Sequence, residues 1–139
     1  MKVRWLVIGI LLLTIGIALF FLFPRTTTFG EELYETITTE QFTSVSMYEL
    51  HDTDPITVQI EGSENVTRFL QPSSSMEMVQ VSAPPTDVRY SLTIVSYDTG
   101  QTYSLLVSEA EISLENRNYE IASDNVLFQS ISEQLGNAE

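Results

Sequence analysis

The stretch from Trp5 to Phe23 constrains this chain most, because it contains 19 residues and no charged side chain. As a helix with a rise of about 1.5 Å per residue, it would be roughly 28 Å long, close to the hydrocarbon thickness of a bilayer. Pro24 ends the stretch, and Arg25 follows where a membrane–water interface would lie. We therefore predict that residues 1–25 form an N-terminal transmembrane anchor.

The basic residues around this segment predict its orientation. Lys2, Arg4 and the terminal amine precede it, whereas only Arg25 follows it closely. The positive-inside rule then predicts a single pass through a cell membrane by residues 5–23, with the N-terminus in the cytoplasm and residues 26–139 outside. The alternative is a cleaved signal peptide, whose apolar core would span about 7–15 residues and end at an A-x-A-like site. The exit reads FLFPRTTTFG, without such a site, and both interpretations export the remainder of the chain.

Charge divides the chain into the same two parts. Residues 1–25 carry three basic residues and no acid, whereas residues 26–139 carry all 19 acidic residues against three arginines, giving formal charges of +3 and −16. A surface this acidic excludes a nucleic-acid partner, which requires basic residues to neutralise phosphates. It favours a cationic protein or peptide partner. The absence of cysteine excludes disulfides, thiol catalysis, cysteine-ligated zinc and a lipid-modified cysteine.

The segment 26–41 connects the anchor to the rest of the chain, and its pattern is ambiguous. Thr26 to Thr28 form a polar spacer, while Leu33 and Ile37 are four residues apart, as on one stripe of a helix. Threonines weaken the helical propensity of the segment. We interpret residues 26–41 as a linker or short helix, and residues 42–139 as an extracytoplasmic α+β domain.

From residue 42 onwards the hydrophobic period changes to two, which is typical of strands. The expected strands span residues 42–50, 56–60, 76–82, 88–97, 102–108, 111–115 and 119–122. One expected helix runs from a cap at Ser63 to Pro72, and the other from caps at Ser123 and Asp124 to Gly136. The predicted fold is α+β: an antiparallel meander of consecutive strands, with two short helices on one face and water on the other.

Three stretches of this domain carry a resemblance to known proteins: ITVQIEGSENVTRFLQ, VRYSLTIVSYDTGQTYSLLV and NRNYEIASDNVLFQSISEQL. They follow the pattern strand, helix, x-Y-x-L-x-I, D-x-G-x-x-Y-x-L, N-x-x-Y-x-I and a closing helix. Over residues 42–135 the chain resembles small membrane-anchored extracytoplasmic domains of unknown function on exported proteins of Gram-positive bacilli. The resemblance implies the α+β fold and a cell-surface location, and it transfers no site residues. The anchoring cysteine of the lipoprotein versions is missing here.

His51 is the only histidine and therefore the main catalytic candidate. Asp52 and Asp54 flank it in an expected turn, so one interpretation is an extracellular hydrolase that uses His51 with nearby carboxylates or a serine. No G-x-S-x-G nucleophile elbow occurs in the sequence. The competing interpretation, an exposed turn histidine without a catalytic role, is the one we favour.

Carboxylates in two regions are candidates for a calcium site, because hard oxygen ligands suit this ion. One set is Asp52, Asp54 and Glu61, and the other is Glu109, Glu111 and Glu115. An EF-hand loop beginning at Asp52 is excluded, since its sixth and twelfth positions hold a threonine and a serine instead of glycine and glutamate. The competing interpretation is a set of solvated surface carboxylates. No other cofactor is expected.

These observations predict a single-pass, membrane-anchored protein whose outer domain serves binding or interaction and not catalysis. The exposed sheet face and its edges are the expected contact surfaces, and Tyr97 is an outward-facing aromatic residue beside a turn. An alternative is the hydrolase described above. A further alternative is a membrane-tethered subunit whose helix itself contacts a larger complex.

Overall fold

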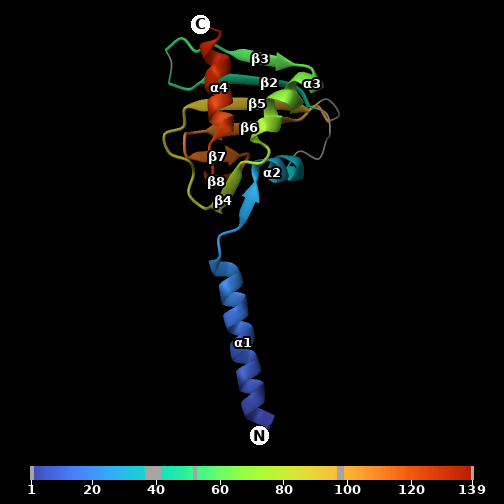
Figure 1. Cartoon of the computed structure of the whole chain (residues 1–139), viewed down its shortest axis with the longest axis vertical. Coiled ribbons are helices and arrows are strands. Elements are labelled where there is room, and N and C mark those ends of the chain that lie inside the picture. Colours follow the sequence, from blue (N-terminus) through green and yellow to red (C-terminus); the bar gives the residue numbers. More distant parts are fainter. Residues whose placement is uncertain (1, 37–41, 52, 97–98, 139) are drawn as a thin grey trace.

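The computed structural model describes residues 2–36, 42–51, 53–96 and 99–138, and consists of a projecting helix and an α+β domain (Figure 1). Helix α1 spans Lys2–Leu22, and its 20 residues Val3–Leu22 are long and apolar enough to cross a membrane. No part of this stretch is buried inside the protein. The predicted N-terminal apolar helix is thus confirmed, and its length and composition fit either a membrane anchor or a signal sequence.

Only three residues separate α1 from the domain. The N–H of Phe23 still donates to a carbonyl one turn back in α1 (3.1 Å), and the carbonyl of Arg25 already accepts from the N–H of Gln80 in the sheet (3.1 Å). Strand β1, Thr26–Thr28, then pairs antiparallel with β4, Glu77–Val81. The helix and the sheet are therefore joined with almost no free chain between them.

Helix α2, Phe29–Thr36, follows β1 directly. Thr28 and Glu31 form a capping box: the N–H of Glu31 donates to Oγ1 of Thr28 (3.3 Å), and the N–H of Thr28 donates to Oε2 of Glu31 (3.2 Å). Phe29 and Leu33 are buried in the core of the domain. The helical interpretation of residues 26–41 is therefore the one observed, with a short strand ahead of it, while residues 37–41 lie outside the described residues.

The described strands form one antiparallel sheet in the order β1-β4-β8-β7-β6-β5-β2-β3. The α+β class with an open antiparallel sheet is confirmed. The strands not yet delimited are β2 Phe42–Glu49, β3 Val58–Glu61, β5 Tyr90–Ser96, β6 Thr102–Val107, β7 Glu111–Leu114 and β8 Arg117–Ile121.

The consecutive strand order that we predicted is wrong around β4, which pairs with neither β3 nor β5. Strands β5 to β8 form a meander, but β4 pairs with β8 at the far side of the sheet, and β5 pairs with β2. The cause is the connection after β3, because helix α3, Ser63–Leu70, and the 3₁₀ turn Gln71–Ser73 carry the chain across the inner face of the sheet. The turn between β7 and β8 is also shorter than the expected strands 111–115 and 119–122 imply. It consists of Glu115 (φ 55°) and Asn116 instead of residues 116–118.

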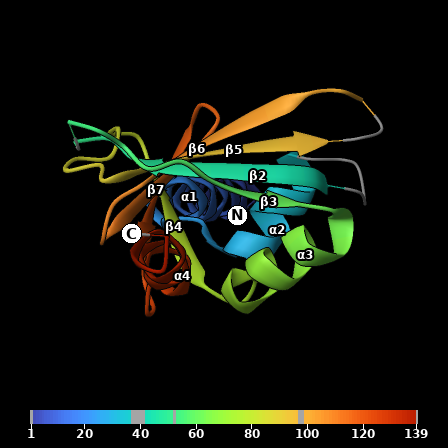
Figure 2. The same cartoon turned by 90° about the horizontal axis from the view of Figure 1, so that it is seen from above.

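Three helices, not two, cover the inner face of the sheet (Figure 2). Two predicted caps are wrong by one or two residues: Gly62 (φ 89°) precedes α3 in place of Ser63, and Asn125 caps α4, Val126–Gly136, by accepting from the N–H of Phe128 (3.0 Å). Gly136 is the last helical residue and not the position after it.

The core lies between these helices and the alternating inward residues of the strands. The period of two in the expected strands also predicts which of their residues face inward. Ile56 is predicted inward, but it is 38% exposed because β3 begins only at Val58. Most of the residues predicted inward are buried: Val45, Met47, Tyr90, Leu92, Ile94, Tyr103, Leu105, Val107, Ile112, Leu114 and Tyr119. The others, Val58, Ile60, Val88 and Ile121, are half-buried. Helices α3 and α4 contribute Val66, Phe69, Leu70, Leu127, Ile131 and Leu135.

Close packing of α2 against the 3₁₀ turn predicts that Gly30→Ala destabilises the domain. A Cβ at Gly30 would lie 2.9 Å from the backbone oxygen of Ser74 and 3.0 Å from its Cβ, so the helix would have to shift. We expect a loss of about 1–3 kcal/mol in the free energy of unfolding. Near-UV circular dichroism of the tyrosines would follow denaturation of the full chain in detergent, because the single tryptophan, Trp5, lies in α1.

Gly136→Ala is the matched control for this substitution. A Cβ there meets no atom within 4 Å, so alanine should leave stability unchanged or raise it slightly through its higher helix propensity. Equal stability of the two variants would contradict the packing argument.

Candidate functional site

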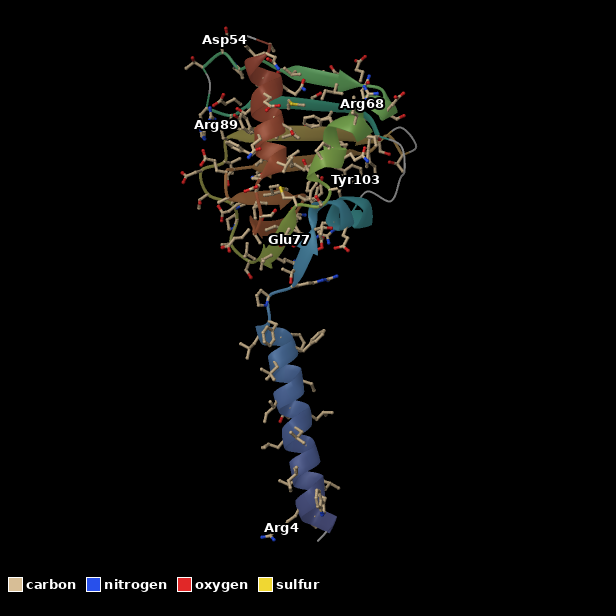
Figure 3. All side chains as sticks on the ribbon, viewed as in Figure 1. Arg4, Asp54, Arg68, Glu77, Arg89 and Tyr103 are labelled. Carbon is tan, nitrogen blue, oxygen red and sulfur yellow. The ribbon has the colours of Figure 1, made fainter. Side chains whose placement is uncertain are left out.

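A cavity of about 390 Å³, lined mostly by polar and charged residues, lies where β5 begins, β6 ends and β7 begins. Arg89, one of its lining residues, is at the lateral margin of the domain opposite Arg68 (Figure 3). The lining combines three carboxylates with a single guanidinium, so its formal charge is negative. The full lining is Thr86, Asp87, Arg89, Ser108, Glu109, Ala110 and Glu111.

Hydrogen bonds fix part of this cavity wall. Oε2 of Glu111 accepts from the backbone N–H (2.7 Å) and from Oγ1 (3.0 Å) of Thr86. Nε of Arg89 donates to Oε1 of Glu49 (2.8 Å), and its guanidinium lies 5.4 Å from the centre of the Tyr90 ring. The hydrogen bond to Glu49 raises the pKa of Arg89, so this residue remains a cation. Two lining groups are thus already satisfied within the protein.

The remaining carboxylates give the cavity its chemistry. Asp87 adopts a left-handed backbone conformation (φ 52°) at the cavity wall, and both Asp87 and Glu109 are exposed. Neither side chain makes a hydrogen bond or ion pair with any other part of the chain that the structure describes. Exposed anionic oxygens of this kind suit an incoming ammonium or guanidinium group.

His51, the candidate residue of the hydrolase alternative, lies near this cavity but outside its wall. His51 is exposed on the turn after β2, and the preceding N–H of Leu50 donates to the carbonyl of Arg89 (2.8 Å). Asp54 is exposed on the same turn, and Asp52 lies outside the described residues, as does Tyr97. None of the three cavities that we describe includes His51 in its lining.

The described residues bring neither proposed calcium set together, and Asp52 of the first set lies outside them. Within the described ranges, no three histidine, aspartate or glutamate side chains are grouped so that they could hold a metal ion. Glu111 and Glu115 flank β7 at opposite ends, about 13 Å apart at the usual rise per residue. Oε1 of Glu115 instead accepts from the N–H of Ser104 (2.7 Å). Of the first set, the structure describes only Asp54 and Glu61. Asp54 lies four residues before β3, and Glu61 is the last residue of β3.

A buried ionic cluster joins α2 to β8, and our sequence analysis missed it. Oε2 of Glu32, whose residue is 3% exposed, accepts from the hydroxyl of Tyr119 (2.6 Å) and from the guanidinium of Arg117 (2.9 Å). Burial is the largest cause that raises the pKa of Tyr119, followed by its hydrogen bond to Glu32. The signal was present in the sequence, because Phe29, Glu32 and Leu33 are spaced i, i+3, i+4 and so share one helix face.

Two further cavities lie along α3. One of about 270 Å³, between α2 and α3, has an apolar floor formed by Phe29, Leu33 and Leu70. The other, of about 360 Å³, is polar and includes Glu64 and Arg68, which form an exposed ion pair (2.9 Å).

Comparison of the chain with protein-family models, with curated proteins and with solved structures finds no match. Of the groups described above, the acidic cavity is accessible to a ligand, whereas the Glu32 cluster is enclosed by α2 and the sheet and acts in stability.

The Glu32 cluster predicts that Tyr119→Phe destabilises the domain. This change removes a hydrogen bond to a buried carboxylate, which should lower the free energy of unfolding by about 1.5–3 kcal/mol. Glu64→Gln is the control, since it breaks only the exposed pair with Arg68 and should cost about 0.5 kcal/mol or less. Denaturant titration of the full chain in detergent would measure both values.

The same cluster predicts a specific pH dependence. Because folding raises the pKa of Tyr119, the unfolded chain releases the phenolic proton at about pH 10 while the folded chain retains it. The contribution of this group to stability is therefore complete below about pH 10 and is lost as the pH rises above it. Tyr119→Phe should show a smaller alkaline decline than the unmodified protein. Identical declines would contradict the assignment.

Proposed function

We propose that this chain is a single-pass membrane protein whose domain outside the cytoplasm binds a cationic protein or peptide without catalysing a reaction. The observation that carries the proposal is the joint between α1 and the domain. An apolar helix of bilayer length leads, after three residues, into a paired strand of a folded sheet. Such a joint suits a retained anchor, because β1 and the buried residue Phe29 belong to the same fold that begins directly after Arg25.

The orientation follows from the charges that flank α1. Lys2 and Arg4 precede the apolar stretch, and the positive-inside rule keeps such residues in the cytoplasm. The domain of formal charge −16 is then extracytoplasmic, in keeping with the exported domains of Gram-positive bacilli that the sequence resembles.

Charge complementarity supports the choice of partner. The acidic cavity presents the carboxylates of Asp87 and Glu109, and the domain as a whole attracts cations over the distance of a Debye length. Helices α2, α3 and α4 lie on the inner face of the sheet (Figure 2), so the outer face offers a partner a second surface. Its central positions carry small polar side chains, among them Ser46, Thr93 and Ser104.

The hydrolase alternative lacks a comparable observation in its favour. His51 lies on an exposed turn, and the cavity beside that turn is lined by carboxylates and Arg89. A nucleophile, a base and an orienting group would have to lie within hydrogen-bonding reach of one another. We therefore do not propose catalysis by His51.

The anchor and its orientation predict a labelling pattern in intact cells. The chain has no cysteine, so Thr53→Cys and Val3→Cys each introduce a single reactive thiol. A membrane-impermeant maleimide should label residue 53 in intact cells, and residue 3 only after permeabilisation. The mature protein should retain its N-terminal residues in mass spectrometry, and a start near Thr26 would contradict the anchor.

Binding of a cationic partner predicts a dependence on the cavity carboxylates. Asp87→Asn with Glu109→Gln should weaken binding of a lysine-rich peptide about fivefold, since two exposed charge pairs contribute about 0.5 kcal/mol each. Asparagine tolerates the positive φ of residue 87, so the fold should be preserved.

The matched control for this double variant is Glu77→Gln with Glu133→Gln, which removes the same charge from exposed positions outside the cavity. Isothermal titration of the full chain in detergent at two salt concentrations measures all three proteins. Equal weakening in both double variants would show a general effect of net charge and would contradict a role for the cavity.

A further inference from the structure

The strand that follows the membrane helix determines which edge of the domain meets the bilayer. The uncharged residues Trp5–Phe23 would span roughly 28 Å as a helix, close to the hydrocarbon thickness, so Phe23 lies near its outer boundary. The two residues from Phe23 to Arg25 reach at most about 7 Å. The headgroup layer is about 5–8 Å deep on each side. Arg25 therefore lies within this layer or directly above it.

Strand β4 brings a second segment to the same level. Since β1 leaves the membrane and β4 runs antiparallel to it, β4 runs back towards the membrane. Thr26 pairs with Val79, and Arg25 accepts the next hydrogen bond from Gln80. By the same register Val81 stands opposite Pro24. Figure 1 shows the end of β4 and the start of β1 as the parts of the domain nearest α1.

The loop that leaves β4 has a composition suited to a lipid interface. It reads Ser82-Ala83-Pro84-Pro85 and carries no charge, and its first three residues are exposed. The two prolines have no backbone N–H to be desolvated. Both ends of the loop are held in place. After Pro85, Thr86 donates two hydrogen bonds to Glu111, and before Ser82, strand β4 is paired with β1 and β8.

Electrostatics favour the same edge over the rest of the domain. Arg25 directly precedes β1, and Arg117 begins β8, whose next residue Asn118 pairs with Val81 at the end of β4, so both residues lie at the edge of the sheet nearest α1. Two of the four arginines that follow α1 are therefore gathered here. Arg117 is paired with Glu32, so Arg25 supplies the cation at this edge, whereas most of the acidic domain would be repelled by anionic headgroups.

We infer that the loop from Ser82 to Pro85, together with Arg25, forms a lipid-contacting edge on which the domain rests against the outer headgroup layer of its own membrane. This inference rests on the proposed function, because it requires α1 to remain in the bilayer. It gives the domain one fixed orientation, with the β2–β3 turn at the end away from the membrane. Asp54, on that turn, lies at the far end of the domain from α1 (Figure 3).

Single-cysteine variants of the full chain test the inference, since the natural sequence has no cysteine. Ala83→Cys reports on the loop, Thr53→Cys on the far turn and Ile15→Cys on the middle of α1. Each thiol carries an environment-sensitive fluorophore, and the protein is reconstituted in phosphatidylcholine nanodiscs that contain lipids with a nitroxide quencher on the headgroup or on the acyl chain.

The expected result is that headgroup nitroxide removes most of the emission at residue 83 and leaves residue 53 unchanged, while acyl-chain nitroxide quenches residue 15. If residue 15 is quenched but residues 83 and 53 respond alike to headgroup nitroxide, the contact edge is wrong and the anchor stands. If residue 15 is not quenched, α1 does not span the bilayer, and both the proposed anchor and the edge fail.

Discussion

Burial of one face of an eight-stranded antiparallel sheet is the constraint on which the rest of this structure depends. The inward side chains of the strands need a cover, and three short helices supply it. None of these helices is long enough to be stable alone in water. Each is held by the residues that it buries, such as Phe29 in α2, Phe69 in α3 and Ile131 in α4.

The same requirement explains what could be predicted from the sequence. Alternation is a local property, so the inward residues of β5 and β6 were identified correctly from their period of two. Strand order is not local. Nothing within β4 itself distinguishes pairing with β5 from pairing with β8, and the crossing by α3 decides it. The predicted N-caps of α3 and α4 were wrong by one or two residues, because the sequence alone makes Ser63, Ser123 and Asp124 acceptable capping residues.

The candidate site was less predictable than the fold for a related reason. The acidic cavity joins residues of the β4–β5 and β6–β7 connections, which the sequence separates by about twenty positions. Sequence spacing grouped Glu111 with Glu115, yet an extended strand holds them apart. The Glu32 cluster was within reach of a helical-face argument, but only if residues 29–36 were first recognised as a buried helix, which the threonines and acids obscured.

The apolar helix α1 is coupled to the folded core through β1 and α2. These elements follow α1 after only three residues, and they are tied to the sheet by β1–β4 pairing, by the capping box of Thr28 and Glu31, and by the buried carboxylate of Glu32. A force or tilt applied at Pro24 therefore acts on the folded core and not on a flexible spacer. In the membrane-anchored protein that we propose, the short joint limits how far the acidic domain can retreat from anionic lipids, so the domain turns the uncharged loop from Ser82 to Pro85, with Arg25, towards them.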